Sequence, residues 1–116
     1  MTAVETFFSA WGMAEADARN AAIQAAVADD VTYADPRTEA PLSGPNAISE
    51  YVGMFTQMAP GAVAEVVKSD TIHGATRATV AFRMADGKEQ FGQYFVEPAE
   101  GKLTRLVGFV GTGAPE

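Results

Sequence analysis

In the first half of the chain, large apolar residues recur at spacings of three and four, which is the period of a helix packed along one face. Thr2 and Glu5 have the spacing of a capping box at the start of the first helix. Asn46 is a residue type that caps the N-terminus of a helix. The pattern predicts helices over residues 2–13, over residues 17–28, and from residue 46 to the Pro60-Gly61 pair, with a short strand ending at Asp35-Pro36 before the third.

After Gly61 the apolar period changes from about 3.6 to about 2, the alternation typical of strands. Only short links separate the apolar segments, among them His73-Gly74 and Asp86-Gly87. Links this short join antiparallel neighbours, because a parallel pair needs a crossover of a dozen or more residues. The sequence therefore predicts an α+β domain with a mostly antiparallel sheet, whose later strands cover residues 63–72, 75–84, 88–97 and 103–110.

The last predicted strand is apolar on both faces, with Leu106 and Val110 on one and Leu103, Val107 and Phe109 on the other. A sheet covered by helices on one side needs only one apolar face. We therefore expect a homodimer formed through the outer face of the sheet. The tail from residue 112 to residue 116 follows no such pattern and is expected to be frayed.

Composition narrows the classes of function. The 116 residues suit one domain, over residues 1–116, and the 8 basic against 15 acidic residues give a net charge of −7. That sign disfavours nucleic acid and anionic membranes as partners. The chain has no cysteine, no nucleotide-binding glycine signature, no apolar run long enough to span a membrane, and an early Glu5 that interrupts any signal peptide. We expect no cofactor and a cytoplasmic location.

His73 is the only histidine, so any imidazole chemistry must use it. It precedes Gly74 in a predicted hairpin turn, a position that is usually on the surface. One histidine without cysteine also makes a transition-metal site improbable, because only carboxylates remain to complete the ligands. No metal site is expected.

Several segments resemble the nuclear transport factor 2-like superfamily, and within it the SnoaL-like polyketide cyclases and the ketosteroid isomerases. They are Ala28-Asp29-Asp30-Val31-Thr32-Tyr33-Ala34-Asp35-Pro36, Gly44-Pro45-Asn46-Ala47-Ile48, His73-Gly74, Gly101-Lys102-Leu103 and Gly108-Phe109-Val110-Gly111. The resemblance covers nearly the whole chain. It implies a cone, in which a strongly curved sheet wraps around three helices and leaves a pocket between them.

The resemblance also implies roles for particular residues. Asp35 matches the aspartate before proline that serves as general base in the isomerases. Phe7 or Phe8 falls where those enzymes have a tyrosine, and Gln93 falls where they have a protonated aspartate. A glutamine amide can donate a hydrogen bond to a developing enolate, although less strongly than that pair. The last strand lacks the carboxylate that the cyclases place there.

Two interpretations of Asp35 remain open. At the mouth of a cone, beside Tyr33 and among apolar side chains, it would be a suitable base toward a weak carbon acid. Alternatively, the Asp-Pro pair ends a strand, and the carboxylate accepts backbone N–H groups in the loop. Two interpretations are also open for the aromatic residues, since each is either part of the core or part of the pocket lining. The candidate lining residues are Trp11, Phe8, Tyr51, Phe55, Phe91, Phe95 and Val110.

The sequence thus leads to a functional hypothesis. We expect a pocket for a small, largely apolar molecule, with isomerase, cyclase or hydratase-type lyase chemistry in which Asp35 is the general base. Gln93 or Tyr33 would polarise a substrate oxygen, and His73 is a further candidate. The alternatives are a non-catalytic ligand-binding or dimerisation module and an accessory subunit of a larger enzyme.

Overall fold

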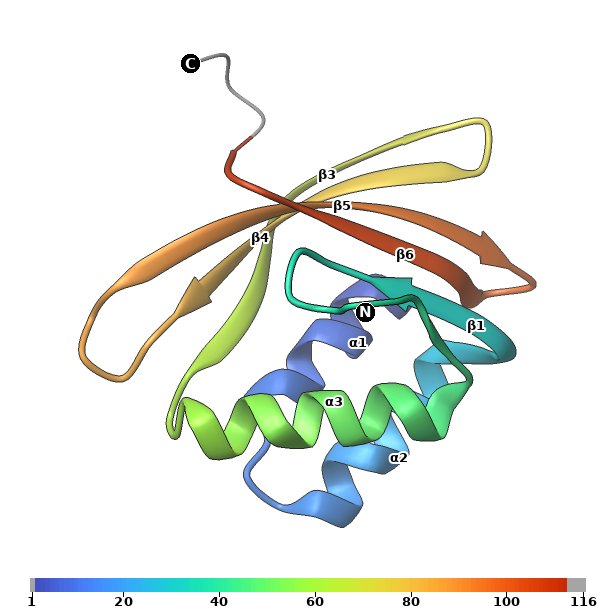
Figure 1. Ribbon diagram of the computed structural model, residues 1–116. Helices are drawn as coiled ribbons and strands as arrows, with labels where there is room; N and C mark the ends of the chain where they lie inside the picture. Colours follow the sequence, from blue (N-terminus) through green and yellow to red (C-terminus); the bar gives the residue numbers. More distant parts are fainter. Residues whose placement is uncertain (1, 113–116) are drawn as a thin grey trace.

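The computed structural model describes residues 2–112, and its helices and sheet form two layers (Figure 1). Residues 113–116 of the tail that we expected to be frayed lie outside the described residues. In chain order the elements are α1 (Ala3–Ser9), the 3-10 helix η1 (Ala10–Gly12), α2 (Ala16–Ala26), β1 (Val27–Ala34), β2 (Leu42–Ser43), α3 (Pro45–Met58), β3 (Val63–Ile72), β4 (Ala75–Arg83), β5 (Glu89–Ala99) and β6 (Lys102–Val110).

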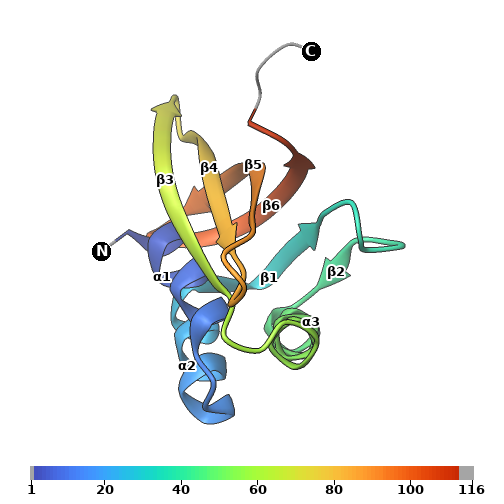
Figure 2. The ribbon, with the colours of Figure 1, turned by 90° about the vertical axis from the view of Figure 1, so that its left-hand side faces the viewer.

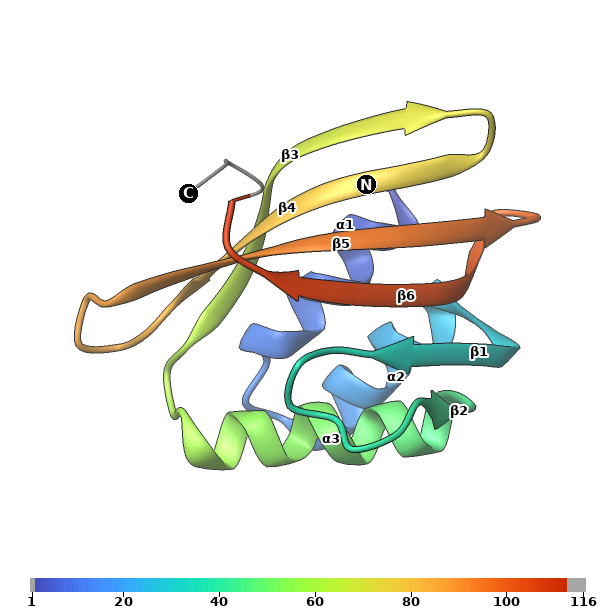
Figure 3. The same cartoon turned by 45° about the horizontal axis from the view of Figure 1, so that its top comes forward.

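The sheet has the strand order β2-β1-β6-β5-β4-β3. All neighbouring strands are antiparallel except β1 and β6, which run parallel. Figure 3 shows the long strands side by side, and Figure 2 shows that the sheet curves over the helices, which cover one of its faces. The predicted α+β class with a curved, mostly antiparallel sheet is therefore confirmed, and the sheet is open rather than closed into a barrel.

The helix starts follow the local capping chemistry. At α1 the predicted capping box forms, because Glu5 N donates to Thr2 Oγ1 at 3.2 Å and Thr2 N donates to Glu5 Oε1 at 3.0 Å. At α3 the expectation for Asn46 is wrong. Gly44 is the N-cap, and Pro45 takes the first helical position, where its fixed φ suits a helix and its missing N–H is not needed.

A bulge in β6 decides which leucines enter the core. Pairing with β5 shifts by one residue between Arg105 and Leu103, so Thr104 is the extra residue, and its hydroxyl donates to the carbonyl of Glu97 at 2.6 Å. As a result Leu103 and Leu106 are both buried, although simple alternation put them on opposite faces. The core combines this inner face with the apolar faces of the helices.

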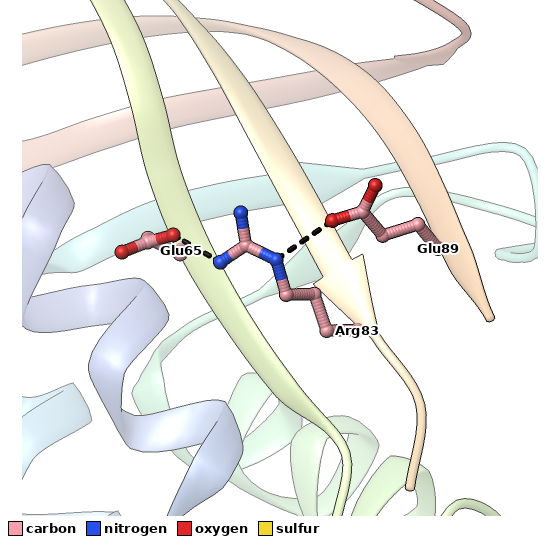
Figure 4. Close-up of polar contacts among 3 residues, drawn as sticks. All are labelled: Glu65, Arg83 and Glu89. Atoms are coloured by element: carbon pink, nitrogen blue, oxygen red, sulfur yellow. Dashed lines mark hydrogen bonds and ion pairs between the residues drawn. The ribbon is translucent and has the colours of Figure 1, made fainter. Parts of the chain in front are cut away.

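The opposite, outer face of the sheet mixes ion pairs with apolar side chains. Arg83 on β4 bridges Glu65 on β3 and Glu89 on β5, its Nε lying 2.8 Å from Glu89 Oε2 (Figure 4). Further along the same face, Phe95 and Phe109 pack edge to face with ring centroids 5.7 Å apart. They are 48% and 55% exposed, so the outer face carries an uncovered aromatic pair.

Candidate functional site

A cavity of about 500 Å³ opens between α3, η1 and the inner face of β4, β5 and β6. Its wall is mostly apolar. Of the described residues that line it, Asp35 alone carries a carboxyl group. The lining also includes Trp11, Pro36, Arg37, Tyr51, Phe55, Phe82, Met84, Gln90, Phe91, Gly92, Tyr94, Gly108, Phe109, Val110, Gly111 and Thr112.

Four donors surround the Asp35 carboxylate. Its Oδ1 accepts the backbone N–H groups of Arg37 and Thr38 at 2.8 and 3.1 Å. Its Oδ2 accepts the phenolic hydroxyls of Tyr33 and Tyr51 at 2.7 and 2.6 Å. Both interpretations of Asp35 from the sequence therefore describe part of the geometry: one oxygen holds the loop, and the other faces the tyrosines.

The hydrogen bonds extend to the third tyrosine of the chain. The hydroxyl of Tyr94 lies 2.9 Å from that of Tyr33. Because Tyr33 gives its only proton to Asp35, the shared proton comes from Tyr94. The hydrogen bonds link Tyr94 to Tyr33, Tyr33 to Asp35, and Asp35 to Tyr51. Tyr94 and Tyr51, at the two ends of this series, line the cavity, whereas Tyr33 is fully buried behind them. We call these four residues the tyrosine–aspartate cluster.

Three separate elements bring the cluster together. Tyr33 lies on β1, and Asp35 is the first residue after that strand. The two residues are two positions apart, so both side chains leave the backbone on the same side. Tyr51 comes from α3. Tyr94 comes from β5, where Gly108 of β6 is its direct partner. A Cβ on Gly108 would lie 2.6 Å from the Tyr94 ring, so the missing side chain leaves the space that the ring occupies.

Burial keeps the phenols of the cluster protonated. Burial is the main cause that raises the pKa of Tyr33 well above its usual value, and the neighbouring Tyr94 and Asp35 add to it. Burial likewise raises the pKa of Tyr51, with the hydrogen bond to Asp35 as the next cause. The pKa of Tyr94 is also raised, again chiefly by burial. All three therefore act as neutral hydrogen-bonding groups near neutral pH.

Among the residues proposed from the sequence, six line the cavity: Trp11, Asp35, Tyr51, Phe55, Phe91 and Val110. Tyr33 reaches the site through Asp35 without lining the cavity. Phe8 is fully buried in the core, where its ring packs against Tyr94 with centroids 4.8 Å apart. It supports a wall residue instead of forming the wall.

Three proposed residues lie elsewhere, and strand geometry explains each. Gln93 and Phe95 alternate with Tyr94 along β5, so their side chains leave from the outer face. Gln93 Nε2 donates to Thr79 Oγ1 at 2.7 Å across the strands, and Phe95 packs on Phe109. His73 is exposed in the β3–β4 turn with a φ of 47° and does not line the cavity.

Tyr94 and Phe82 line the cavity, yet neither was singled out from the sequence. The alternation along the strand showed that Tyr94 and Gln93 lie on opposite faces, so only one of the two could face the helices. It did not show which one, because that depends on the register between strands. The resemblance favoured Gln93, whereas the register favours Tyr94.

Comparison with known proteins defines the class. The structure is similar to a candidate isomerase of the SnoaL-like family from Agrobacterium tumefaciens, with 23% identity, a TM-score of 0.84 and 95% of each chain covered. It is similar to a ketosteroid isomerase-like protein from Catenulispora acidiphila solved with trimethylamine, with 14% identity, a TM-score of 0.77, and 96% and 88% coverage. It is also similar to an epoxide hydrolase from M. tuberculosis, with 18% identity, a TM-score of 0.68, and 94% and 80% coverage. At these identities the likeness concerns the fold.

The fold is thus that of the nuclear transport factor 2-like proteins, as the resemblance implied. Residues 4–108 match the SnoaL-like domain, and the chain belongs to that family. No curated protein matches the chain. None of the helices in the described part of the chain has the length and apolar character that crossing a membrane requires.

Proposed function

We propose that the protein binds a small, largely apolar molecule in the cavity and that Asp35 receives a proton from it, in isomerase, cyclase or hydratase-type lyase chemistry. One observation carries the proposal: the single carboxylate of the cavity wall is hydrogen-bonded to a tyrosine that lines the same wall. The trimethylamine held by one protein of the same fold supports small-molecule binding by this architecture.

The geometry favours an indirect route for the proton. A carboxylate offers about four lone-pair positions, and the four donors around Asp35 occupy them. Tyr51 in contrast is only half-buried and keeps its oxygen lone pairs free for a ligand. In this route a ligand proton moves to the Tyr51 oxygen while the Tyr51 proton moves to Asp35 Oδ2. Tyr51 is then the contact residue and Asp35 the final acceptor.

The test needs a ligand first, so a fragment library is screened by NMR for compounds that shift cavity resonances, and those compounds are assayed for turnover. We expect Asp35→Asn to lower turnover by a factor of roughly 100 or more, because the amide cannot accept the proton. Tyr51→Phe should have a comparable effect. Asp70→Asn is the matched control, because Asp70 is an exposed carboxylate that pairs with Arg77. Turnover that survives Asp35→Asn would show that Asp35 is not the base.

A non-catalytic binding module is the second candidate, and the filled coordination of Asp35 favours it. A carboxylate held by two backbone and two phenolic donors suits a rigid wall as well as a base. Hydrogen–deuterium exchange at the carbon atoms of a bound ligand separates the two functions. Exchange that requires Asp35 supports catalysis, whereas a ligand that binds and never exchanges or reacts supports capture alone.

A homodimer through the outer sheet face is part of the proposal. The exposed pair Phe95 and Phe109 supports it, because a two-fold interface buries the same patch from both copies. Sedimentation velocity tests it: Phe95→Glu, which does not touch the cavity, should give monomers, whereas Met58→Glu, on a more exposed site of α3, should not. A monomeric wild-type protein would refute the interface. The cytoplasmic location stays a prediction from the sequence.

A further inference from the structure

All three tyrosine hydroxyl protons of the cluster are donated in hydrogen bonds within the cluster. Tyr33 and Tyr51 each donate their single proton to Asp35, and Tyr94 donates its proton to Tyr33. With Asp35 as the carboxylate, no member of the cluster has a proton left to offer to a ligand. What the cluster presents at the cavity wall is therefore the oxygen lone pairs of the half-buried Tyr51, because Tyr94 is only 3% exposed and its hydroxyl contact with Tyr33 is buried.

Other donors of the wall do not replace these protons. The indole Nε1 of Trp11 is buried beneath its neighbours and has no hydrogen-bond partner among the described residues, so a ligand in the cavity does not reach it. Arg37, Gln90 and Thr112 line the cavity with exposed side chains. Water competes for all three, and a group bound there stays near the solvent. The polar groups at the interior end of the cavity can thus accept hydrogen bonds from a ligand but cannot donate them.

We infer that the cavity selects ligands whose polar group is a hydrogen-bond donor, a hydroxyl or an amine, over carbonyl compounds of the same shape. This inference rests on the proposed binding function and specifies its ligand class: of the proposed chemistries it favours a hydratase-type reaction on a hydroxyl compound over isomerase or cyclase reactions of a carbonyl compound. A hydroxyl or amine placed against the Tyr51 oxygen replaces the bond that it loses to water. A carbonyl in the same place meets lone pairs, loses its bonds to water and gains none.

The sharpest test uses ligands that differ only in this group. Cyclohexanol, cyclohexylamine and cyclohexanone have nearly the same size and ring shape, so burial of their apolar surface contributes similarly. Dissociation constants are measured by NMR titration at neutral pH, following resonances of Trp11 and Phe55. Cyclohexanol and cyclohexanone are the neutral matched pair, and we expect the alcohol to bind roughly tenfold or more tightly than the ketone. Cyclohexylamine is protonated at neutral pH and reports in addition on the charge of Asp35. A ketone that binds as tightly as the alcohol overturns the inference.

Asp35→Asn gives the second arm, because it changes the direction of the hydrogen bonds. The Asn oxygen can keep accepting from the loop N–H groups, and its NH2 then donates to the tyrosines. The proton of Tyr51, which lines the cavity, becomes free to turn toward a ligand, so we expect the preference for the alcohol over the ketone to disappear or reverse. Asp70→Asn should preserve the wild-type ratio. An unchanged ratio in Asp35→Asn would mean that the cluster does not set the selectivity.

The same titrations separate failure of the inference from failure of the proposed function. If the ketone binds the cavity as well as the donors do, the pocket stands and its ligand class is wrong. If none of the three probes shifts the resonances of Trp11 or Phe55, the cavity does not take a small apolar molecule, and the proposed function falls together with the inference.

Discussion

Gly108 positions Tyr94, and replacing it with alanine should disturb the whole cluster. The added Cβ would lie 2.6 Å from Cε2 and 2.8 Å from Cζ of the Tyr94 ring, whereas carbon atoms in contact sit about 3.5–4.0 Å apart. The ring must therefore move by about 1 Å. A movement of that size away from Tyr33 carries the Tyr94 hydroxyl, now 2.9 Å from the Tyr33 hydroxyl, beyond hydrogen-bond distance.

The magnitude follows from three effects. Overpacking a core costs about 1–3 kcal/mol. Losing the buried bond between Tyr94 and Tyr33 adds about 1 kcal/mol. Against these, replacing a glycine whose backbone has an ordinary φ lowers the entropy of the unfolded chain and stabilises by about 0.4–1 kcal/mol. We expect a net loss of about 1–3 kcal/mol in the free energy of unfolding.

Urea unfolding followed by circular dichroism measures this change. Gly53→Ala, in the middle of α3, is the matched control: its Cβ meets only one guanidinium nitrogen of Arg19, at 3.3 Å, and helix propensity favours alanine by up to about 1 kcal/mol. In the Tyr94→Ala background, Gly108→Ala should cost almost nothing, because the ring is gone. A Gly108→Ala protein as stable as the wild type, or an equal cost in both backgrounds, would refute the packing argument.

Three further predictions concern the cluster and the bulge. Tyr33→Phe removes a donor to Asp35 and the acceptor of Tyr94, both away from solvent, and should lower the free energy of unfolding by about 1–3 kcal/mol in denaturant titrations. The pKa of every tyrosine is raised in the folded protein, so the protonated tyrosines stabilise the fold below about pH 10, and this stability is lost as the pH rises further. Tyrosinate absorbance should therefore appear together with unfolding. A step in phenolate absorbance near pH 10 with unchanged circular dichroism would contradict this. Deleting Thr104 removes the bulge and should turn Leu103 or Leu106 out of the core, at a cost of about 2–5 kcal/mol in the same titrations; a cost below 1 kcal/mol would show that the register can slip freely.

Local patterns accounted for most of the elements. The capping box at Thr2 formed as expected, since its partners are three residues apart and need nothing from the rest of the chain. The four later strands also begin and end within two residues of the predicted bounds, because each is long enough to show its period. The two-residue strand β2 went unnoticed, since two residues carry no period, and it exists through its pairing with Thr32 and Tyr33.

The site was predicted less completely. Asp35 and Tyr51 were proposed, one from its motif before Pro36 and the other from its place on a helical apolar stripe, and both line the cavity. Gln93 was chosen where Tyr94 faces inward, because the resemblance gave a position and not a strand face. The role of Gly108 was also invisible, since a glycine in a strand shows its purpose only when its cross-strand partner is known.

By itself, the sequence determined that the first half of the chain would be mainly helical and the second half a sheet, and that a carboxylate would stand where the two meet. Periodicity and capping encode these properties within a few residues. Only the tertiary structure decided that the three tyrosines converge on Asp35, because they come from two strands and a helix far apart in the chain. Register, the bulge at Thr104 and the contact of a ring with Gly108 set that convergence, and each of them depends on segments that meet only after folding.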